Sequence, residues 1–178
     1  MNFINLFILA MSTITQPISF NFNKLNDDQL IVVNDTVMGG KSSSSVEFNE
    51  TSIKFTGSVS LQNNGGFASL RMLWPFENID GIKKLQLRLK GDGKTYQFRL
   101  RTNRGFDGAS YVYEFNTIKD KLMSIEMDID KFIPSFRGRV LKDMPKLLLK
   151  DVQQMGILIS NKQTGNFNIH LNQLVLEM

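Results

Sequence analysis

The chain contains no cysteine, and its 178 residues include one histidine, one tryptophan and four prolines. Without cysteine it has no disulfide bond, no thiolate metal ligand and no cysteine nucleophile. A single histidine, His170, excludes a histidine-rich metal centre and most histidine-based catalysis. No apolar run approaches the roughly 20 residues that a helix needs to span a bilayer. These absences favour a binding protein, and we expect no enzyme, no cofactor and no metal site.

The rest of the composition is typical of a globular protein, with 42% hydrophobic residues and 14 phenylalanines. This much apolar surface offsets the conformational entropy of the chain, and the length suits one domain. Charge is distributed unevenly. Residues 1–80 have four Lys or Arg against seven Asp or Glu, whereas residues 81–178 have 17 against 10, a net charge of +7. The second part of the chain therefore predicts a basic surface that faces an anionic partner.

The first 15 residues are apolar from Phe3 to Met11 and then small and polar. Their length, and the small residues near Ser12 and Thr15, fit a short secretory signal. The lack of Lys or Arg before the apolar run fits an ordinary buried N-terminal segment instead. Both interpretations stay open. We expect residues 16–178 to form a single domain in the cytoplasm or at a membrane, with export through residues 1–15 as the alternative.

From residue 18 onward, apolar and polar residues alternate, which is the pattern of strands with one buried face. Dipeptides rich in Gly and Asn separate these stretches and favour tight turns between antiparallel strands. Only residues 145–154 have a helical spacing, and that segment is short. The pattern predicts an all-β antiparallel sandwich or jelly roll with at most a short helix. The alternating stretches are 20–23, 53–55, 85–90, 96–101, 125–130 and 167–172.

Residues 35–42 read DTVMGGKS and end like a phosphate-binding P-loop. That motif requires glycine where Asp35 stands and a helix after the serine, but the residues that follow predict a strand. We therefore expect an ordered loop instead. Asn34 and Asp35 would bond to the nearby backbone, while Gly39 and Gly40 allow a left-handed corner or a close backbone approach. Met38 is interpreted as core filler, the commoner outcome, with an exposed contact as the alternative.

Arg99 and Arg101 lie two residues apart in a predicted strand, so their side chains project from one face. Arg88 and Lys90 lie in the preceding strand and extend that face into a basic stripe if residues 91–93 close a hairpin. Such a stripe suits carboxylates or phosphates. A solvated sheet face is the alternative interpretation.

Arg137 and Arg139 form a second basic element in a predicted loop. Tyr96 and Phe98 alternate with the arginines of their strand and point to its other face. Aromatic rings therefore do not interleave with the basic charges, and no nucleic acid is expected as a partner. The acidic residues of 126–130 lack a nearby loop of oxygen ligands, which favours a solvated face over a calcium site.

Five stretches, taken in their order along the chain, resemble the complex I intermediate-associated protein 30 family. They are residues 33–42, 60–71, 91–96, 132–139 and 162–167, and the resemblance spans about residues 18–178. It implies a galactose-binding-domain-like β-sandwich, similar in architecture to carbohydrate-binding modules. It also implies a non-enzymatic role, because mitochondrial members are assembly factors for respiratory NADH:ubiquinone oxidoreductase. Residues 1–20 contain no arginine, which favours a small stand-alone, bacterial homologue over the mitochondrial factor.

We therefore predict a chaperone-like adaptor that binds proteins, such as respiratory-complex subunits or other membrane-assembly intermediates. A carbohydrate-binding module with a glycan ligand is the alternative prediction. The residues assigned to the partner surface belong to two ordered loops and to the basic elements. They are Asn34, Asp35, Met38, Gly39, Gly40, Asn64, Arg71, Arg99, Arg101, Arg137 and Arg139.

Overall fold

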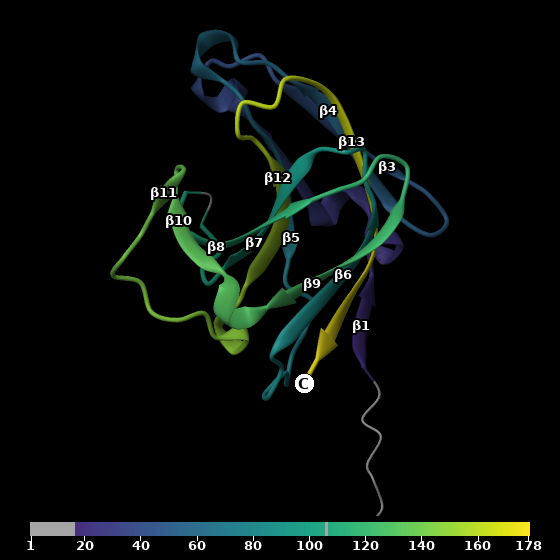
Figure 1. Cartoon of the computed structure of the whole chain (residues 1–178), viewed down its shortest axis with the longest axis vertical. Helices are drawn as coiled ribbons and strands as arrows, with labels where there is room; N and C mark the ends of the chain where they lie inside the picture. The colour runs from purple at the N-terminus through teal and green to yellow at the C-terminus, as the bar shows by residue number, and fades with distance from the viewer. Residues whose placement is uncertain (1–16, 106) are drawn as a thin grey trace, which may run out of the picture.

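The computed structural model describes residues 17–105 and 107–178, which fold into two antiparallel sheets packed face to face (Figure 1). The predicted all-β antiparallel sandwich of the jelly-roll type is confirmed. Sheet A consists of β1 (Ile18–Asn21), β3 (Ser43–Phe48), β4 (Ile53–Val59), β6 (Lys84–Lys90), β9 (Leu122–Asp128) and β13 (Gly165–Glu177). Sheet B consists of β2 (Leu30–Asn34), β5 (Ala68–Leu73), β7 (Thr95–Arg101), β8 (Ser110–Asn116), β10 (Ile133–Phe136), β11 (Arg139–Val140) and β12 (Gln154–Ile159).

Short 3-10 turns connect the strands, and the described part of the chain contains no α-helix. No helix within the same ranges is long and apolar enough to cross a membrane. The helical spacing at 145–154 corresponds only to one such turn, and both interpretations of residues 1–15 concern residues outside the described ones. The turns are η1 (Phe22–Lys24), η2 (Asp27–Gln29), η3 (Asp35–Met38), η4 (Gln62–Asn64), η5 (Ile129–Lys131) and η6 (Leu149–Asp151).

The strand order shows that both sheets depend on pairing between distant parts of the sequence. Sheet A runs β3-β4-β13-β6-β9, and β1 also pairs with β13. Strand β13 pairs with β4 through residues 165–171, with β1 through 173–176 and with β6 through 170–177. Sheet B runs β11-β10-β8-β7-β12-β5-β2, so β12 lies between β5 and β7. This central position of β12 determines which side chains meet on the outward face of sheet B.

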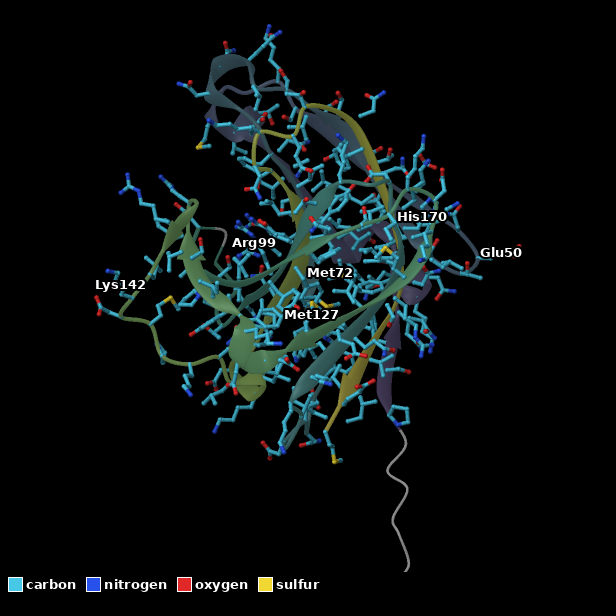
Figure 2. All side chains as sticks on the ribbon, viewed as in Figure 1. Glu50, Met72, Arg99, Met127, Lys142 and His170 are labelled. Atoms are coloured by element: carbon cyan, nitrogen blue, oxygen red, sulfur yellow. The ribbon has the colours of Figure 1, made fainter. Side chains whose placement is uncertain are left out.

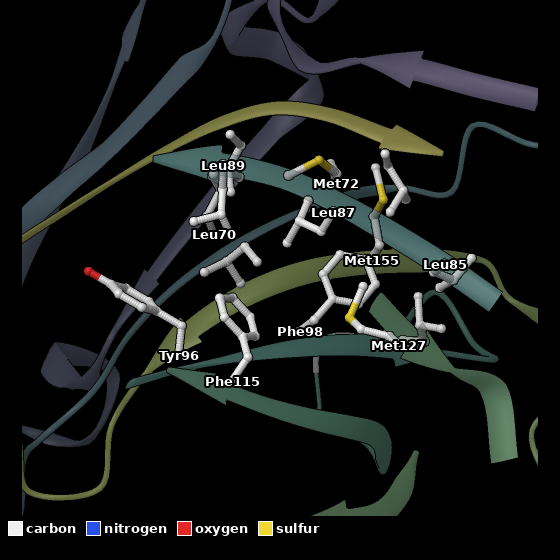
Figure 3. Packing of buried hydrophobic residues seen from close by; sticks show 14 of the residues in the cluster. Leu70, Met72, Leu85, Leu87, Leu89, Tyr96, Phe98, Phe115, Met127 and Met155 are labelled. Carbon is white, nitrogen blue, oxygen red and sulfur yellow. The ribbon is translucent and has the colours of Figure 1, made fainter. Parts of the chain in front are cut away.

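The alternation of apolar residues produces the core, as the sequence predicts. Leu85, Leu87 and Leu89 of β6 are fully buried from sheet A, and Tyr96 and Phe98 of β7 are buried from sheet B. Figure 3 shows these side chains meeting between the two sheets. Because successive residues of a strand point to opposite faces, the polar residues of β7 must point away from the core.

The expected hairpin between β6 and β7 does not form, because these strands belong to different sheets. Residues 91–93 instead cross from sheet A to sheet B. Asp92 fixes this crossing, since its carboxylate accepts hydrogen bonds from the Tyr96 hydroxyl (3.0 Å) and from the backbone N–H groups of Lys94 (3.0 Å) and Asn168 (2.9 Å). Arg88 and Lys90 therefore lie on sheet A, and the basic stripe that would join them to the arginines of β7 is wrong.

We expect Leu87→Ala to lower the free energy of unfolding by about 2–5 kcal/mol, because the leucine is fully buried and leaves a cavity between the sheets. The exposed Leu122 of sheet A, 72% accessible to solvent, provides the matched control. Leu122→Ala should change stability by no more than about 0.5 kcal/mol. Urea denaturation of both variants measures this, and equal effects of the two would contradict the packing described.

Candidate functional site

The Asp35 side chain is fully buried and joins two loops that are distant in sequence. One carboxylate oxygen, Oδ1, accepts a hydrogen bond from the Ser42 N–H at 2.9 Å. The other, Oδ2, accepts hydrogen bonds from the Ser42 hydroxyl and from the N–H groups of Gly66 and Phe67. One carboxylate thereby holds residues 35–42 against residues 60–67, at the upper end of the molecule in Figure 1.

The glycines of these loops make room for that carboxylate. A Cβ atom at Gly40 would lie 2.3 Å from Cγ of Asp35, and one at Gly65 would lie 2.5 Å from its Oδ2. Both distances are far shorter than any van der Waals contact. The Val-Met-Gly-Gly and Asn-Asn-Gly-Gly sequences therefore serve the packing around Asp35. Their glycines build the loops, whereas Val37 and Met38 of the first sequence are exposed.

Burial raises the pKa of the Asp35 carboxyl, whereas the hydrogen bonds from Ser42, Gly66 and Phe67 lower it. The hydrogen bonds together have the larger effect, so the pKa lies below its ordinary value of 3.8. Asp35 is therefore ionised near neutral pH. Its role in the site is indirect, because a buried carboxylate with all these donors can act on a partner only through the loops that it holds.

The same loops expose large apolar side chains. Val37 and Met38 of η3 are 71% and 62% accessible, and Leu61 is 41% accessible; these three residues are called the loop tip below. Asn63 ties the two loops together, since its side-chain Nδ2 donates to the carbonyl oxygen of Gly39 at 3.0 Å. The interpretation of Met38 as core filler is wrong. Asp35 at the start of η3 is buried, whereas Thr36, Val37 and Met38 after it are exposed.

Three other predicted residues, Asn34, Asn64 and Gly39, lie in or next to these loops. The Asn34 side chain is half-buried, and its Oδ1 accepts a hydrogen bond from the Ser44 hydroxyl at 2.6 Å. Asn64 is exposed and has a left-handed backbone with φ of 57°. Gly39 also has a left-handed backbone, with φ of 87°, and ends η3. The structure thus brings the predicted residues of both loops together around Asp35.

A second feature lies on the outward face of sheet B, where Arg71 of β5 and Arg99 of β7 flank Gly156 of β12 in register. Arg101 lies two residues along β7 from Arg99 and shares its face. Figure 2 labels Arg99 on this side of the sheet. Arg71, Arg99 and Arg101 form the arginine cluster. A Cβ atom at Gly156 would lie 2.5 Å from the Leu70 carbonyl oxygen, so glycine is what lets the strands pack there.

The arginine cluster is largely removed from solvent. Burial, and then the charge of Arg71, lower the pKa of Arg99 to about 10. Burial, and then the charges of Arg71 and Arg99, lower the pKa of Arg101 to about 9. Burial also lowers the pKa of Arg71, although the nearby Asp107 partly opposes this. These mutual effects mean that the three guanidinium groups lie close enough to repel one another.

Arg99 and Arg101 differ in their hydrogen bonds. Arg99 donates from Nε and Nη2 to Oε1 of Gln97, at 3.1 and 2.7 Å. Arg101 is only 3% accessible, and neither its Nε nor its Nη1 has a hydrogen-bond partner in the described part of the chain. A buried guanidinium without a partner is unfavourable, because desolvation is not compensated by a hydrogen bond or a counter-charge.

The remaining predicted arginines lie apart from the cluster. Arg137 is exposed, stands over the Phe136 ring and pairs with Asp107 at 2.6 Å. Arg139 is exposed on β11, three strands from β7 in the order of sheet B. The sequence alone did not identify Gly156, nor Val37 and Leu61, which are two of the three residues of the loop tip. The glycine within the apolar residues 155–159 was the available signal, since a glycine inside a strand often marks a close approach.

A small cavity touches Arg71, and a larger one adjoins that cavity without touching the three arginines. The small one of about 20 Å³ lies against Arg71 and Arg104, and the larger one of about 520 Å³ shares Arg104 and Gln154 with it. The larger cavity is lined mainly by apolar side chains. They are Phe20, Leu25, Ile31, Met72, Leu73 and Pro75.

Residues 19–171 match the family model described as complex I intermediate-associated protein 30. The chain belongs to this family. Its resemblance to the family, carried by the loops around Asp35 and by residues 91–96, 132–139 and 162–167, is thereby confirmed. An uncharacterized protein of Schizosaccharomyces pombe is 27% identical over 165 residues, which cover 80% of this chain and 74% of that protein.

Solved structures similar to this family member include carbohydrate-binding modules. The family 11 module of the Clostridium thermocellum cellulase Lic26A-Cel5E has a TM-score of 0.65 and 15% identity, covering 92% of this chain and 95% of that one. The Clostridium thermocellum family 11 module in complex with a mixed-linked tetrasaccharide has a TM-score of 0.59 and 16% identity, covering 83% and 88%. At such identities the likeness shows the fold, a jelly-roll sandwich, and no more.

We expect Asp35→Asn to destabilise the protein by about 1–3 kcal/mol, because the amide cannot accept every hydrogen bond that the carboxylate accepts. The pH dependence gives a second readout. Since the folded pKa is below the unfolded one, the contribution of Asp35 is present above pH 3.8 and is lost as the pH falls below it. Urea denaturation from neutral to acid pH should show this loss in the wild type and a smaller one in the variant. Equal slopes would contradict the assignment.

Proposed function

We propose that this chain is a non-enzymatic protein-binding module that acts as an assembly factor for respiratory NADH:ubiquinone oxidoreductase or for another membrane-assembly intermediate. Membership of the complex I intermediate-associated protein 30 family supports this role. The observation that carries it is the loop tip, where Val37, Met38 and Leu61 stay exposed on loops that a buried carboxylate holds in place.

An exposed apolar group on a fixed loop suits a transient protein partner. Large apolar side chains gain free energy when a partner covers them, and a loop that is already ordered loses little conformational entropy on binding. Methionine is also well suited to the varied surfaces of assembly intermediates, since its side chain is flexible and polarisable. A chaperone-like adaptor needs these properties, because its client is incomplete when it binds.

The exposed charges fit the same role. Arg137 and Arg139 lie at the β10–β11 end of sheet B, and both are open to solvent. Charged residues at the rim of an interface increase the rate of association with an acidic partner more than they increase affinity. We assign the partner contact to the loop tip and the steering of an acidic client to these two arginines.

The double substitution Val37→Asp and Met38→Asp should abolish partner binding and leave the fold intact, because both side chains are exposed. Affinity purification with cross-linking from the native host should recover subunits of the respiratory complex or of another membrane assembly with the wild type. Recovery should fall by about tenfold or more with the double variant.

Leu122→Asp is the control for this experiment, since Leu122 on β9 is as exposed as Val37 but lies on sheet A, away from η3. It should leave recovery unchanged. Failure of the wild type to recover any such subunit, or an equal loss with the control variant, would contradict the proposed function.

The carbohydrate-binding alternative has only the fold as its support. Aromatic rings are the usual platforms for sugar rings, but the described outward positions of β5, β7, β8 and β12 carry none. Tyr96, Phe98, Tyr111 and Phe115 are buried in the core instead. We expect no glycan on an array to bind. Specific binding of a glycan that survives the double substitution at residues 37 and 38 would favour the alternative.

A further inference from the structure

Arg101, on the outward face of sheet B, lacks hydrogen-bond partners for part of its buried guanidinium group. It is almost completely buried, and two of its guanidinium nitrogens have no hydrogen-bond partner within the described residues. Removing one charge from water is unfavourable, and placing two further arginines beside it increases the repulsion. The core does not require this arrangement, because the core-facing residues of β7 are Tyr96, Phe98 and Leu100. An anion bound from outside would supply the missing partner.

The backbone directs the three guanidinium groups toward one place. Arg71 and Arg99 pair with the same residue, Gly156, from its two sides, so their Cα atoms are about 10 Å apart across two strand spacings. Gly156 carries no side chain between them. Arg101 follows two residues later on the same face, roughly 7 Å along β7. Arginine side chains are long enough to converge on an ion above Gly156 from these three positions.

The nearby carboxylates do not neutralise the cluster. Asp107 acts on Arg71 but also pairs with the exposed Arg137 at 2.6 Å. Glu114 accepts hydrogen bonds from the side-chain amides of Gln97 at 3.2 Å and Asn161 at 2.6 Å. No carboxylate acts on Arg99 or Arg101 in the described part of the chain, so these two guanidinium groups leave an excess of about two positive charges.

We propose that Arg71, Arg99 and Arg101 form a binding site for a phosphate group, either free or as a monoester. A phosphate dianion matches the excess charge, and its several oxygens can accept hydrogen bonds from more than one guanidinium at a time. A single carboxylate offers one charge and two oxygens. The proposal goes beyond the proposed function, because the site uses none of the residues of the loop tip and each can fail without the other.

The cavity of about 520 Å³ suggests where the remainder of a monoester would lie. It shares Arg104 and Gln154 with the small cavity against Arg71, and Gln154 pairs in register with Arg101. Its lining is mainly apolar. The phosphate group could therefore come from three sources, which one experiment can distinguish: a free phosphate ion, a polar monoester, or a monoester with an alkyl chain.

The test is isothermal titration calorimetry of the whole chain at low ionic strength with inorganic phosphate, glycerol phosphate, dodecyl phosphate, inorganic sulfate and succinate. We expect the phosphates to bind more tightly than succinate. Tightest binding of inorganic phosphate identifies the free ion as the source, tightest binding of glycerol phosphate a polar monoester, and tightest binding of dodecyl phosphate an alkyl monoester. Absence of binding by every phosphate at about 10 mM, or tighter binding of succinate, overturns the assignment.

The pH dependence of binding checks the charge of the ligand. The second proton of a phosphate monoester dissociates with a pKa of about 6, so the affinity for glycerol phosphate should rise between about pH 5 and about pH 7.5. Sulfate is a dianion throughout this range, and its affinity should stay constant. A flat profile for glycerol phosphate would show that the site does not require a dianion, and would overturn the proposal.

Arg101→Met removes the buried charge and keeps much of the side-chain volume. We expect the affinity for phosphate to fall by about tenfold or more. In the absence of any anion, the melting temperature should rise by about 2–4 °C, because an uncompensated buried charge has been removed. Added phosphate should raise the melting temperature of the wild type and leave that of the variant unchanged.

Two further variants keep this test decisive. Arg101→Lys retains the charge but not the planar fork, and it should bind phosphate more weakly than the wild type without the rise in melting temperature. Arg139→Met removes an exposed arginine on β11 and should change neither quantity. Unchanged phosphate affinity of Arg101→Met, or a melting temperature below that of the wild type without anion, would make Arg101 a structural residue and overturn the site.

Discussion

The burial of Tyr96, Phe98 and Leu100 against sheet A is the interaction on which the rest of the molecule depends. Once these side chains face the core, Gln97, Arg99 and Arg101 must face outward, since a strand alternates its side chains between two faces. The free energy gained in the core therefore holds charged groups in positions that are unfavourable for them, because they are removed from solvent and lie next to like charges. Positions of this kind are where binding proteins place residues whose role is with a ligand rather than with the fold.

The loops around Asp35 are held together by one buried carboxylate. Most of the residues that carry the family resemblance there are needed to bury one carboxylate, with glycines at the points of closest approach. The residues that a partner would meet are Val37 and Met38, which begin the Val-Met-Gly-Gly sequence, and Leu61. In this chain the glycines of the distinctive sequences therefore support the surface, and the neighbouring apolar side chains form it.

The sequence was sufficient for the fold class and for the faces of individual strands, because alternation is a local property. Leu85–Leu89 and Tyr96–Leu100 point inward as their spacing predicts. Pairing is not local. The segment Gly91-Asp92-Gly93 has the composition of a hairpin turn, but in the structure it crosses from one sheet to the other. The carboxylate of Asp35 depends on donors 31 and 32 residues away, and Arg101 pairs in register with Gln154 of β12. Neither has a signal in the neighbouring sequence.

The position of β13 has a consequence for how the chain acquires its structure. This strand lies at the centre of sheet A, between β4 and β6, and yet it follows both of them by many residues in the chain. During synthesis β4 and β6 leave the ribosome without the strand that joins them, and their edges stay unpaired until β13 emerges. Because strands with unpaired edges are prone to aggregate, the growing chain is most exposed to aggregation in the interval before β13 emerges.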